Sequence, residues 1–293
     1  LRGFATSQER IRVVPLDRSR SPYISSIKNV AAQNHFYTVD GFEEPDAFEK
    51  VLSEVEGQAL GTIRGFANGE FPPSEENRWA FAHYMALQSV RGPDTRRTTE
   101  HLRATMVRME VGAGGRKNVG SWIRKNLGFD PSPKQEDRVW DEATQPGGPP
   151  IGFDNLTHIQ NTVETAIELT PYLATRPWTL VRFDRRSLIT SDAPISLIRR
   201  PGDEPWEEVG YATAWGVTFP LTRKMGLLMS DPMALLQGVE AEDPRVQQFR
   251  EMVLTGRIEQ VQTGTTAMEE LFNLHTADSA REYVFHHPED ERY

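Results

Sequence analysis

Apolar residues along this chain repeat with two different periods. Between residues 44 and 173 they recur every three or four positions, which is the spacing of amphipathic helices. From residue 174 onward they form short runs rich in β-branched and aromatic residues, separated by polar turns. We therefore expect a helical half at about 44–173 and a sheet-rich half at about 174–293, completed by N-terminal strands at 11–16 and 35–39.

The helical half contains four segments with a clear helical period. They are expected at 44–68, 75–91, 94–111 and 155–173. Between the last two, residues 130–152 are rich in proline, glycine and charge. Such a composition is typical of a mobile loop or of a boundary between the two halves, so no helix is predicted there.

The sheet-rich half is organised around residues 178–198. This stretch contains apolar, β-prone runs on either side of a charged segment at 184–186, which we interpret as the turn of a β-hairpin. Two further strands are predicted at 214–221 and 225–229. They complete the part of the sheet that follows the helical half.

The C-terminal region is predicted to return to helix and to end in a strand. Amphipathic helices are expected at 243–255 and at 265–272, and an edge strand at 283–285. The polar segment 286–290 is expected to be frayed. Its adjacent His286 and His287 would face opposite ways on a strand, which makes them a poor metal-binding pair.

Together these elements predict an α+β fold. An antiparallel or mixed β-sheet of about five strands is expected to pack against a bundle of helices. A chain of 293 residues is long enough to bury a full core, and we expect one domain, 1–293.

Composition narrows the class of protein. Hydrophobic residues make up 38% and charged residues 26% of the chain, which is ordinary for a soluble globular protein. The chain has no cysteine, which excludes disulfides, thiolate catalysis and cysteine-bound metals. No apolar run approaches the ~20 residues that span a bilayer, and no secretion signal follows Leu1, so we expect no membrane partner and a cytoplasmic location.

Charge is unevenly distributed along the chain. The formal net charge is -9, which disfavours a general nucleic-acid-binding surface, yet residues 91–125 are mostly basic. This basic run is either a solvated face or a site for a phosphate-bearing ligand. Residues 112–117 are rich in glycine but match neither the P-loop nor the dinucleotide spacing, so we interpret them as a turn.

One acidic residue does not fit the polar face of the first long helix. At 100° per residue Glu56 falls at the edge of the apolar stripe, where a carboxylate needs a partner or has its pKa raised. Arg78, on the next helix, is a candidate partner. The alternatives are a structural ion pair, or a site in which Glu56 is catalytic and Arg78 binds substrate.

The polar bend at 190–194 is the second candidate for chemistry. Ser191 and Asp192 either bond to nearby backbone, as turn residues do, or take part in catalysis. Asp192 with Glu56 would form a carboxylate pair suited to acid-base work or to one Mg²⁺ ion. No cofactor is required by the sequence, and its identity stays open, with one Mg²⁺ ion compatible with such a pair.

Three more polar residues are candidates for substrate binding. Gln88 lies on a helix that is apolar almost all round, so its amide needs a partner. Arg91 ends the same helix, and its planar guanidinium suits a phosphate or carboxylate. Asn273 closes the helix predicted at 265–272.

Three short motifs resemble a known family. They are L-R-G-F-A at the start of the chain, S-I-K-N-V-A-A-Q-N-H-F-Y-T at 26–38 and T-S-D-A-P at 190–194. The chain resembles the bacterial family catalogued as domain of unknown function 4238, from Leu1 to about Phe285. That family typically carries His-His-x-x-Pro just upstream of the first motif, and this sequence starts after that point. The resemblance implies a fold and a set of positions rather than a reaction.

Two classes of function remain open at this stage. The first is a non-enzymatic binding or regulatory module with a polar pocket between helices and sheet. The second is a metal-dependent or acid-base hydrolase acting on a phosphorylated or nucleic-acid substrate. The sequence contains no strong nucleotide, metal or catalytic-triad motif to separate them.

Overall fold

The computed structural model of the protein describes residues 1–17, 20–30, 47–204, 206–236, 238–240 and 242–290. Contacts divide the chain into two compact units. The first comprises Leu1–Val90 and Thr162–Tyr293, and the second comprises Arg91–Asn161. The α+β class expected from the sequence is confirmed by helices packed with two β-sheets. The single-domain interpretation stays a prediction.

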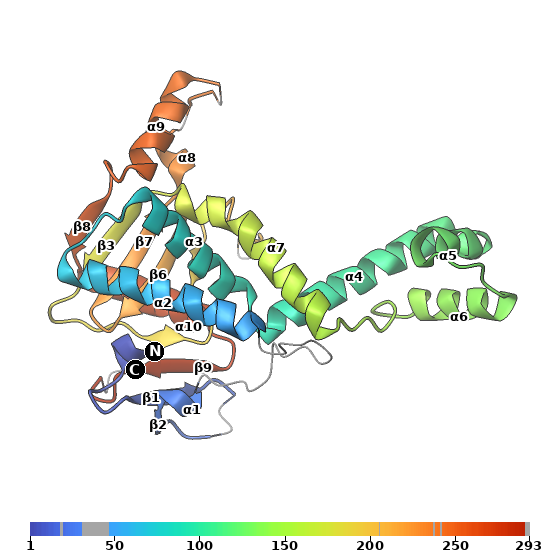
Figure 1. Ribbon diagram of the computed structural model, residues 1–293, viewed down its shortest axis with the longest axis horizontal. Coiled ribbons are helices and arrows are strands. Elements are labelled where there is room, and N and C mark those ends of the chain that lie inside the picture. Colours follow the sequence, from blue (N-terminus) through green and yellow to red (C-terminus); the bar gives the residue numbers. More distant parts are fainter. Residues whose placement is uncertain (18–19, 31–46, 205, 237, 241, 291–293) are drawn as a thin grey trace. The chain divides into compact units, whose positions relative to one another are not determined.

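The first unit contains a five-stranded mixed sheet with the strand order β5-β6-β7-β3-β8 (Figure 1). Only the pairing of β3 with β8 is parallel. Its strands are β3 (Trp178–Arg182), β5 (Ser196–Ile198), β6 (Gly216–Thr222), β7 (Met225–Ser230) and β8 (Gln260–Thr263). The strands predicted at 214–221 and 225–229 are thereby confirmed as β6 and β7.

A second, four-stranded sheet has the order β2-β1-β9-β4. Its strands are β1 (Arg10–Pro15), β2 (Tyr23–Ser26), β4 (Thr190–Ser191) and β9 (Tyr283–His286). The strand predicted at 11–16 is confirmed, whereas 35–39 lies outside the described residues. The C-terminal strand is not an edge strand, because β9 pairs with both β1 and β4.

The hairpin expected around residues 184–186 is wrong. Strand β3 enters the five-stranded sheet, whereas β4 pairs with β9 in the other sheet. The chain therefore leaves one sheet and crosses to the other between Arg182 and Thr190. Both runs are apolar because both are buried, and an apolar run does not indicate which sheet it joins.

Helices cover the first unit on several sides. They are α1 (Ile27–Val30), α2 (Ala47–Asn68), α3 (Glu75–Val90), α8 (Pro232–Leu235), α9 (Pro244–Leu254) and α10 (Thr266–Ser279), with a short 3₁₀ turn η1 (Arg2–Phe4) and with α7 (Asn155–Ala174), which begins in the second unit. Helix α10 continues past the predicted end at 272. Asn273 was expected to end the helix, but it lies within it.

Helices α3 and α10 pack on opposite faces of the five-stranded sheet. Phe81 of α3 lies against Trp178 and Phe219, with ring centroids 6.0 and 6.2 Å apart, and Figure 1 shows α3 crossing these strands. Phe272 of α10 instead lies over Gly226, where an added Cβ would approach its ring to 2.5 Å. Neighbouring residues on a strand face opposite ways, and Phe219 and Gly226 belong to different faces of the β6–β7 pair.

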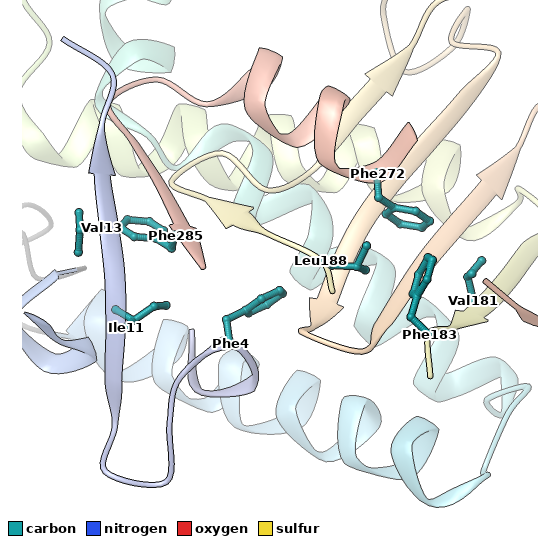
Figure 2. Packing of buried hydrophobic residues seen from close by; sticks show 8 residues of the cluster. All are labelled: Phe4, Ile11, Val13, Val181, Phe183, Leu188, Phe272 and Phe285. Carbon is teal, nitrogen blue, oxygen red and sulfur yellow. The ribbon is translucent and has the colours of Figure 1, made fainter. Parts of the chain in front are cut away.

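A cluster of buried hydrophobic residues joins the two sheets. Figure 2 shows its eight buried residues, which are Phe4, Ile11, Val13, Val181, Phe183, Leu188, Phe272 and Phe285. Ile11, Val13 and Phe285 come from the four-stranded sheet, and the rings of Phe183 and Phe272 meet edge-on at 6.1 Å. Phe4 lies between these two groups, so the first turn of the chain helps to close the core.

The second unit is helical. It contains α4 (Pro93–Gly114), η2 (Arg116–Asn118), α5 (Val119–Leu127) and α6 (Pro133–Thr144), and its core consists of Val107, Val111, Val119, Ile123 and Ala143. The expectation of a loop over 130–152 is wrong for residues 133–144, which form α6. Ser132 and Gln135 cap this helix, with Ser132 N donating to Gln135 Oε1 at 2.8 Å.

Candidate functional site

A pocket of about 490 Å³ opens at the β5 edge of the five-stranded sheet. Strand β5 is only three residues long and lies at the edge of the sheet. The sheet therefore ends there, and residues of α3 and α10, which cover its opposite faces, line the same pocket. Gln88 and Ser89 of α3 form one wall, and His275 and Asp278 of α10 form another. The volume is within the range of small-molecule sites.

The lining of the pocket combines hydroxyl, charged and apolar groups. Besides the residues named above it contains Ala193, Ile195, Ser196, Leu197, Arg199, Val209, Tyr211, Ser279 and Arg281. Ala193 belongs to the bend at 190–194 that the sequence indicated as a candidate site. The predicted location is therefore close to a pocket, although the residues that face it are mostly different.

The loop that carries Tyr211 is held by hydrogen bonds from a buried arginine, Arg176. Arg176 is 2% exposed, and its Nη2 donates to Tyr211 O at 2.8 Å and to Ala214 O at 2.9 Å. Its Nη1 donates to Ser230 O at 3.2 Å, at the end of β7. One guanidinium thus ties the 211–214 segment to the sheet, which holds this wall of the pocket in place before any ligand arrives.

Burial shifts the titration of two pocket residues. Loss of hydration lowers the pKa of His275, and the nearby Asp278 carboxylate only partly opposes this effect. Burial also raises the pKa of Tyr211, which therefore keeps its proton at neutral pH. The pocket thus presents a neutral imidazole and a neutral phenol, together with the charges of Arg199, Arg281 and Asp278.

The two predicted residues of the bend have structural bonds. Asp192 is exposed, yet its carboxylate accepts three backbone N–H groups, from Arg281 at 2.9 Å, Glu282 at 2.7 Å and Tyr283 at 3.2 Å. Ser191 Oγ accepts from Ala193 N at 3.2 Å. Asp192 therefore anchors the end of α10 to the start of β9, and it positions Arg281 at the pocket instead of acting within it.

The proposed pairing of Glu56 with Arg78 is wrong. Glu56 is exposed on α2, so it does not lie at a buried edge. Arg78 is fully buried and forms its ion pair with Glu259, whose side chain is also fully buried. The helical period placed Glu56 beside apolar positions, but α2 covers the unit from outside and buries a narrower stripe, Leu52, Ala59 and Phe66, than the sequence indicated.

Arg78 is surrounded by partners from distant parts of the chain. Its Nε donates to Ala174 O at 2.6 Å and its Nη2 to Arg176 O at 2.5 Å, while its guanidinium carbon lies 4.2 Å from the ring centroid of Trp178. Burial, which outweighs the attraction between the two charges, lowers the pKa of Arg78 and raises the pKa of Glu259. All of these contacts are structural, so Arg78 is not placed to bind a substrate.

The other three predicted substrate-binding residues, Gln88, Asn273 and Arg91, lie in different environments. Gln88 lines the pocket, as its proposed role requires. Asn273 is buried and serves the backbone, since its Oδ1 accepts from Ile189 N at 2.9 Å and its Nδ2 donates to Ser187 O at 3.1 Å. Arg91 belongs to the second unit and is not among the residues that line the pocket.

Part of the basic run at 91–125 is neutralised within the second unit. Arg96 pairs with Glu100 at 3.2 Å and donates to Phe153 O, and Arg97, Arg116 and Arg124 pair with Asp94, Asp137 and Asp130. A hydrogen bond from Phe153 N at 2.9 Å helps to lower the pKa of Glu100. These pairs favour the interpretation of the run as a solvated, ion-paired surface; a phosphate ligand there stays a prediction.

The segment 286–290 is not frayed over its described length. His286 and His287 are 0% and 8% exposed, and Asp290 accepts from Arg223 at 2.9 and 2.6 Å. This bidentate pair holds the segment after β9 against the turn between β6 and β7. Across the described residues, no group of three or more histidine or acidic side chains is arranged to hold a metal ion, so the magnesium site considered for Glu56 and Asp192 has no geometric support there.

Sequence reasoning missed most of the pocket. Tyr211 and Arg199 lie in a polar connection, and His275, Asp278 and Ser279 lie on a helical turn that was predicted to be outside α10. One signal was available: His275, Asp278 and Ser279 follow one another at helical spacing, which would have placed them on one face had the helix been extended.

In the described part of the chain, no helix has the length and apolar character needed to cross a bilayer. A family model described as "Protein of unknown function (DUF4238)" matches residues 1–290. This is the family that the three sequence motifs indicated, and the match extends over nearly all 293 residues. Among curated proteins and solved structures, none matches the chain significantly.

Proposed function

Because the chain belongs to the DUF4238 family, whose description gives no activity, we propose a function from the pocket alone: the protein is a binding module that holds a small anionic ligand at the β5 edge. The observation that carries this proposal is the presence of two arginines, Arg199 and Arg281, in the lining of one pocket of about 490 Å³. Guanidinium groups are the preferred partners of phosphate and carboxylate.

The surroundings of the pocket support binding. The charged residues of the lining are Arg199, Arg281 and one acidic residue, Asp278, so the charged lining is net positive in a chain whose formal net charge is -9. The walls are held by bonds that need no ligand, namely those of Arg176 to the 211–214 segment and of Asp192 to the 281–283 backbone. A preformed site loses little conformational entropy when it binds.

Thermal unfolding in inorganic phosphate tests this proposal. We expect phosphate to raise the Tm relative to chloride at equal ionic strength, by stabilising the folded state by about 1.4 kcal/mol at ten times Kd. The increment should be lost in the Arg199→Gln/Arg281→Gln double variant. Because phosphate also stabilises proteins by exclusion from their surface, the variant's own shift is the baseline to subtract.

Arg200→Gln is the matched control. Arg200 is the next residue on the same connection, but its Nη2 bonds to Asp231 at 3.4 Å and it does not line the pocket. It should therefore keep the full phosphate increment. Equal increments in the wild type and in the double variant would contradict the proposal.

A second candidate function is hydrolysis of a phosphate ester, and the specific observation in its favour is His275. The lowered pKa leaves its imidazole neutral at neutral pH, so a pocket residue is able to accept a proton from an attacking water. In this alternative the protein releases phosphate from p-nitrophenyl phosphate, and His275→Gln abolishes the release. The earlier acid-base pair, Glu56 with Asp192, gains no support from the exposed position of the first and the backbone bonds of the second.

A further inference from the structure

The hydroxyl protons of Ser196 and Ser279 are already used in hydrogen bonds within the protein. A hydroxyl has one proton to donate, and a carbonyl oxygen can only accept. Ser279 Oγ donates to His275 O at 2.5 Å, so its proton is used. Ser196 Oγ lies 2.5 Å from Ser279 Oγ and must therefore be the donor in that bond. Ser196, which is 2% exposed, thus offers the pocket only its oxygen lone pairs.

The same reasoning applies to Tyr211, which also lines the pocket. Ser89 Oγ donates to Met85 O at 2.9 Å, which uses its single proton. Tyr211 Oη donates to Ser89 Oγ, and burial, which raises the pKa of Tyr211, keeps that proton in place. Tyr211 Oη therefore also has only lone pairs left to offer a ligand. Two separate hydrogen-bonded chains thus leave acceptor oxygens on residues that line the pocket.

The charged groups divide the pocket into complementary parts. Arg199 and Arg281 can only donate, whereas the carboxylate of Asp278 accepts, as do Ser196 and Tyr211. A matching ligand needs an anionic group for the guanidiniums and several hydrogen-bond donors for the acceptors. Those donors are better neutral than cationic, because two guanidiniums outweigh one carboxylate and would repel an ammonium group.

We infer that the ligand of this pocket is an anionic sugar, a small polyol that carries a phosphate or carboxylate group. Its hydroxyls donate to Ser196 Oγ, Tyr211 Oη and Asp278, and its anionic group lies against Arg199 and Arg281. The inference rests on the proposed binding function and adds the class of ligand. A pocket of about 490 Å³ accommodates a monosaccharide with its charged substituent.

Isothermal titration calorimetry with matched probes tests the ligand class without altering the protein. Ribose 5-phosphate and pentyl phosphate carry the same charge on a five-carbon body, but only the first has hydroxyls. The hydrogen bonds to Ser196 Oγ and Tyr211 Oη, at about fivefold each, predict a Kd for ribose 5-phosphate about twenty-five-fold below that of pentyl phosphate. The Kd of glucuronate shows whether a sugar that carries a carboxylate binds as well as one that carries a phosphate. The Kd of glutamate shows whether an ammonium group serves as the hydrogen-bond donor in place of sugar hydroxyls.

Variants of the acceptor oxygens complete the test. Ser196→Ala and Tyr211→Phe should each weaken ribose 5-phosphate binding by about fivefold, which brings its Kd closer to that of pentyl phosphate. Ser53→Ala, at an exposed serine of α2, is the control and should leave the Kd for ribose 5-phosphate unchanged. Equal Kd values for ribose 5-phosphate and pentyl phosphate, or tighter binding of glutamate than of both sugars, would overturn the inference. Failure of inorganic phosphate itself to bind would instead overturn the underlying binding function.

Discussion

Arg78→Met is expected to lower the free energy of unfolding by about 3–5 kcal/mol, because it leaves the buried carboxylate of Glu259 without its partner. The variant also loses the hydrogen bonds to Ala174 O and Arg176 O and the contact with the Trp178 ring. These partners come from the end of α7, from the segment that follows it and from the start of β3. Urea unfolding followed by far-UV circular dichroism measures the change.

Two comparisons identify the cause of that loss. Arg64→Met, at an exposed arginine of α2, should change the unfolding free energy by less than about 0.5 kcal/mol. Adding Glu259→Gln to Arg78→Met should recover part of the loss, because a neutral amide costs less to bury than an unpaired charge. A single Arg78→Met variant as stable as the wild type would show that the pair does not hold α3 to the sheet.

Phe272→Ala is expected to cost about 3–5 kcal/mol of unfolding free energy. Phe272 is fully buried where α10 packs on Phe183 and Gly226, in the core that joins the two sheets (Figure 2). Truncation leaves a cavity that the strands on either side cannot close.

Leu274→Ala is the matched control for Phe272→Ala. Leu274 lies two positions further along α10 and is 59% exposed, so its truncation should cost less than about 1 kcal/mol. Calorimetric unfolding of the two variants separates burial from helix propensity, which is similar in both changes. Equal losses at 272 and 274 would contradict the packing of α10 described above.

Local periodicity was sufficient to predict most helices. The segments at 75–91 and 155–173 became α3 and α7 with nearly the predicted ends, because each buries a wide apolar face. Helix α6 was missed, since its few apolar residues lie in a charged stretch and its stability comes from capping by Ser132 and from packing of Ala143 in the core of the second unit. Capping residues are short-range signals that a search for apolar period overlooks.

The sequence did not indicate which strands pair with one another. The run around 190 is β-prone in either sheet, and only the long-range pairing of Thr190 with Phe285 assigns β4 to the four-stranded sheet. The same limit applies to the candidate site. Arg78 was predicted to pair with Glu56, but its actual partner Glu259 lies 181 residues away along the chain, and nothing local connects the two.

The account of function depends on the pocket at the β5 edge being the place where an anionic ligand binds. A crystal structure of the protein with ribose 5-phosphate tests this most directly. We predict density for the phosphate against the guanidiniums of Arg199 and Arg281, with ring hydroxyls within hydrogen-bond distance of Ser196 Oγ and Tyr211 Oη. An empty pocket at saturating ligand, or a ligand bound only elsewhere on the molecule, would contradict it.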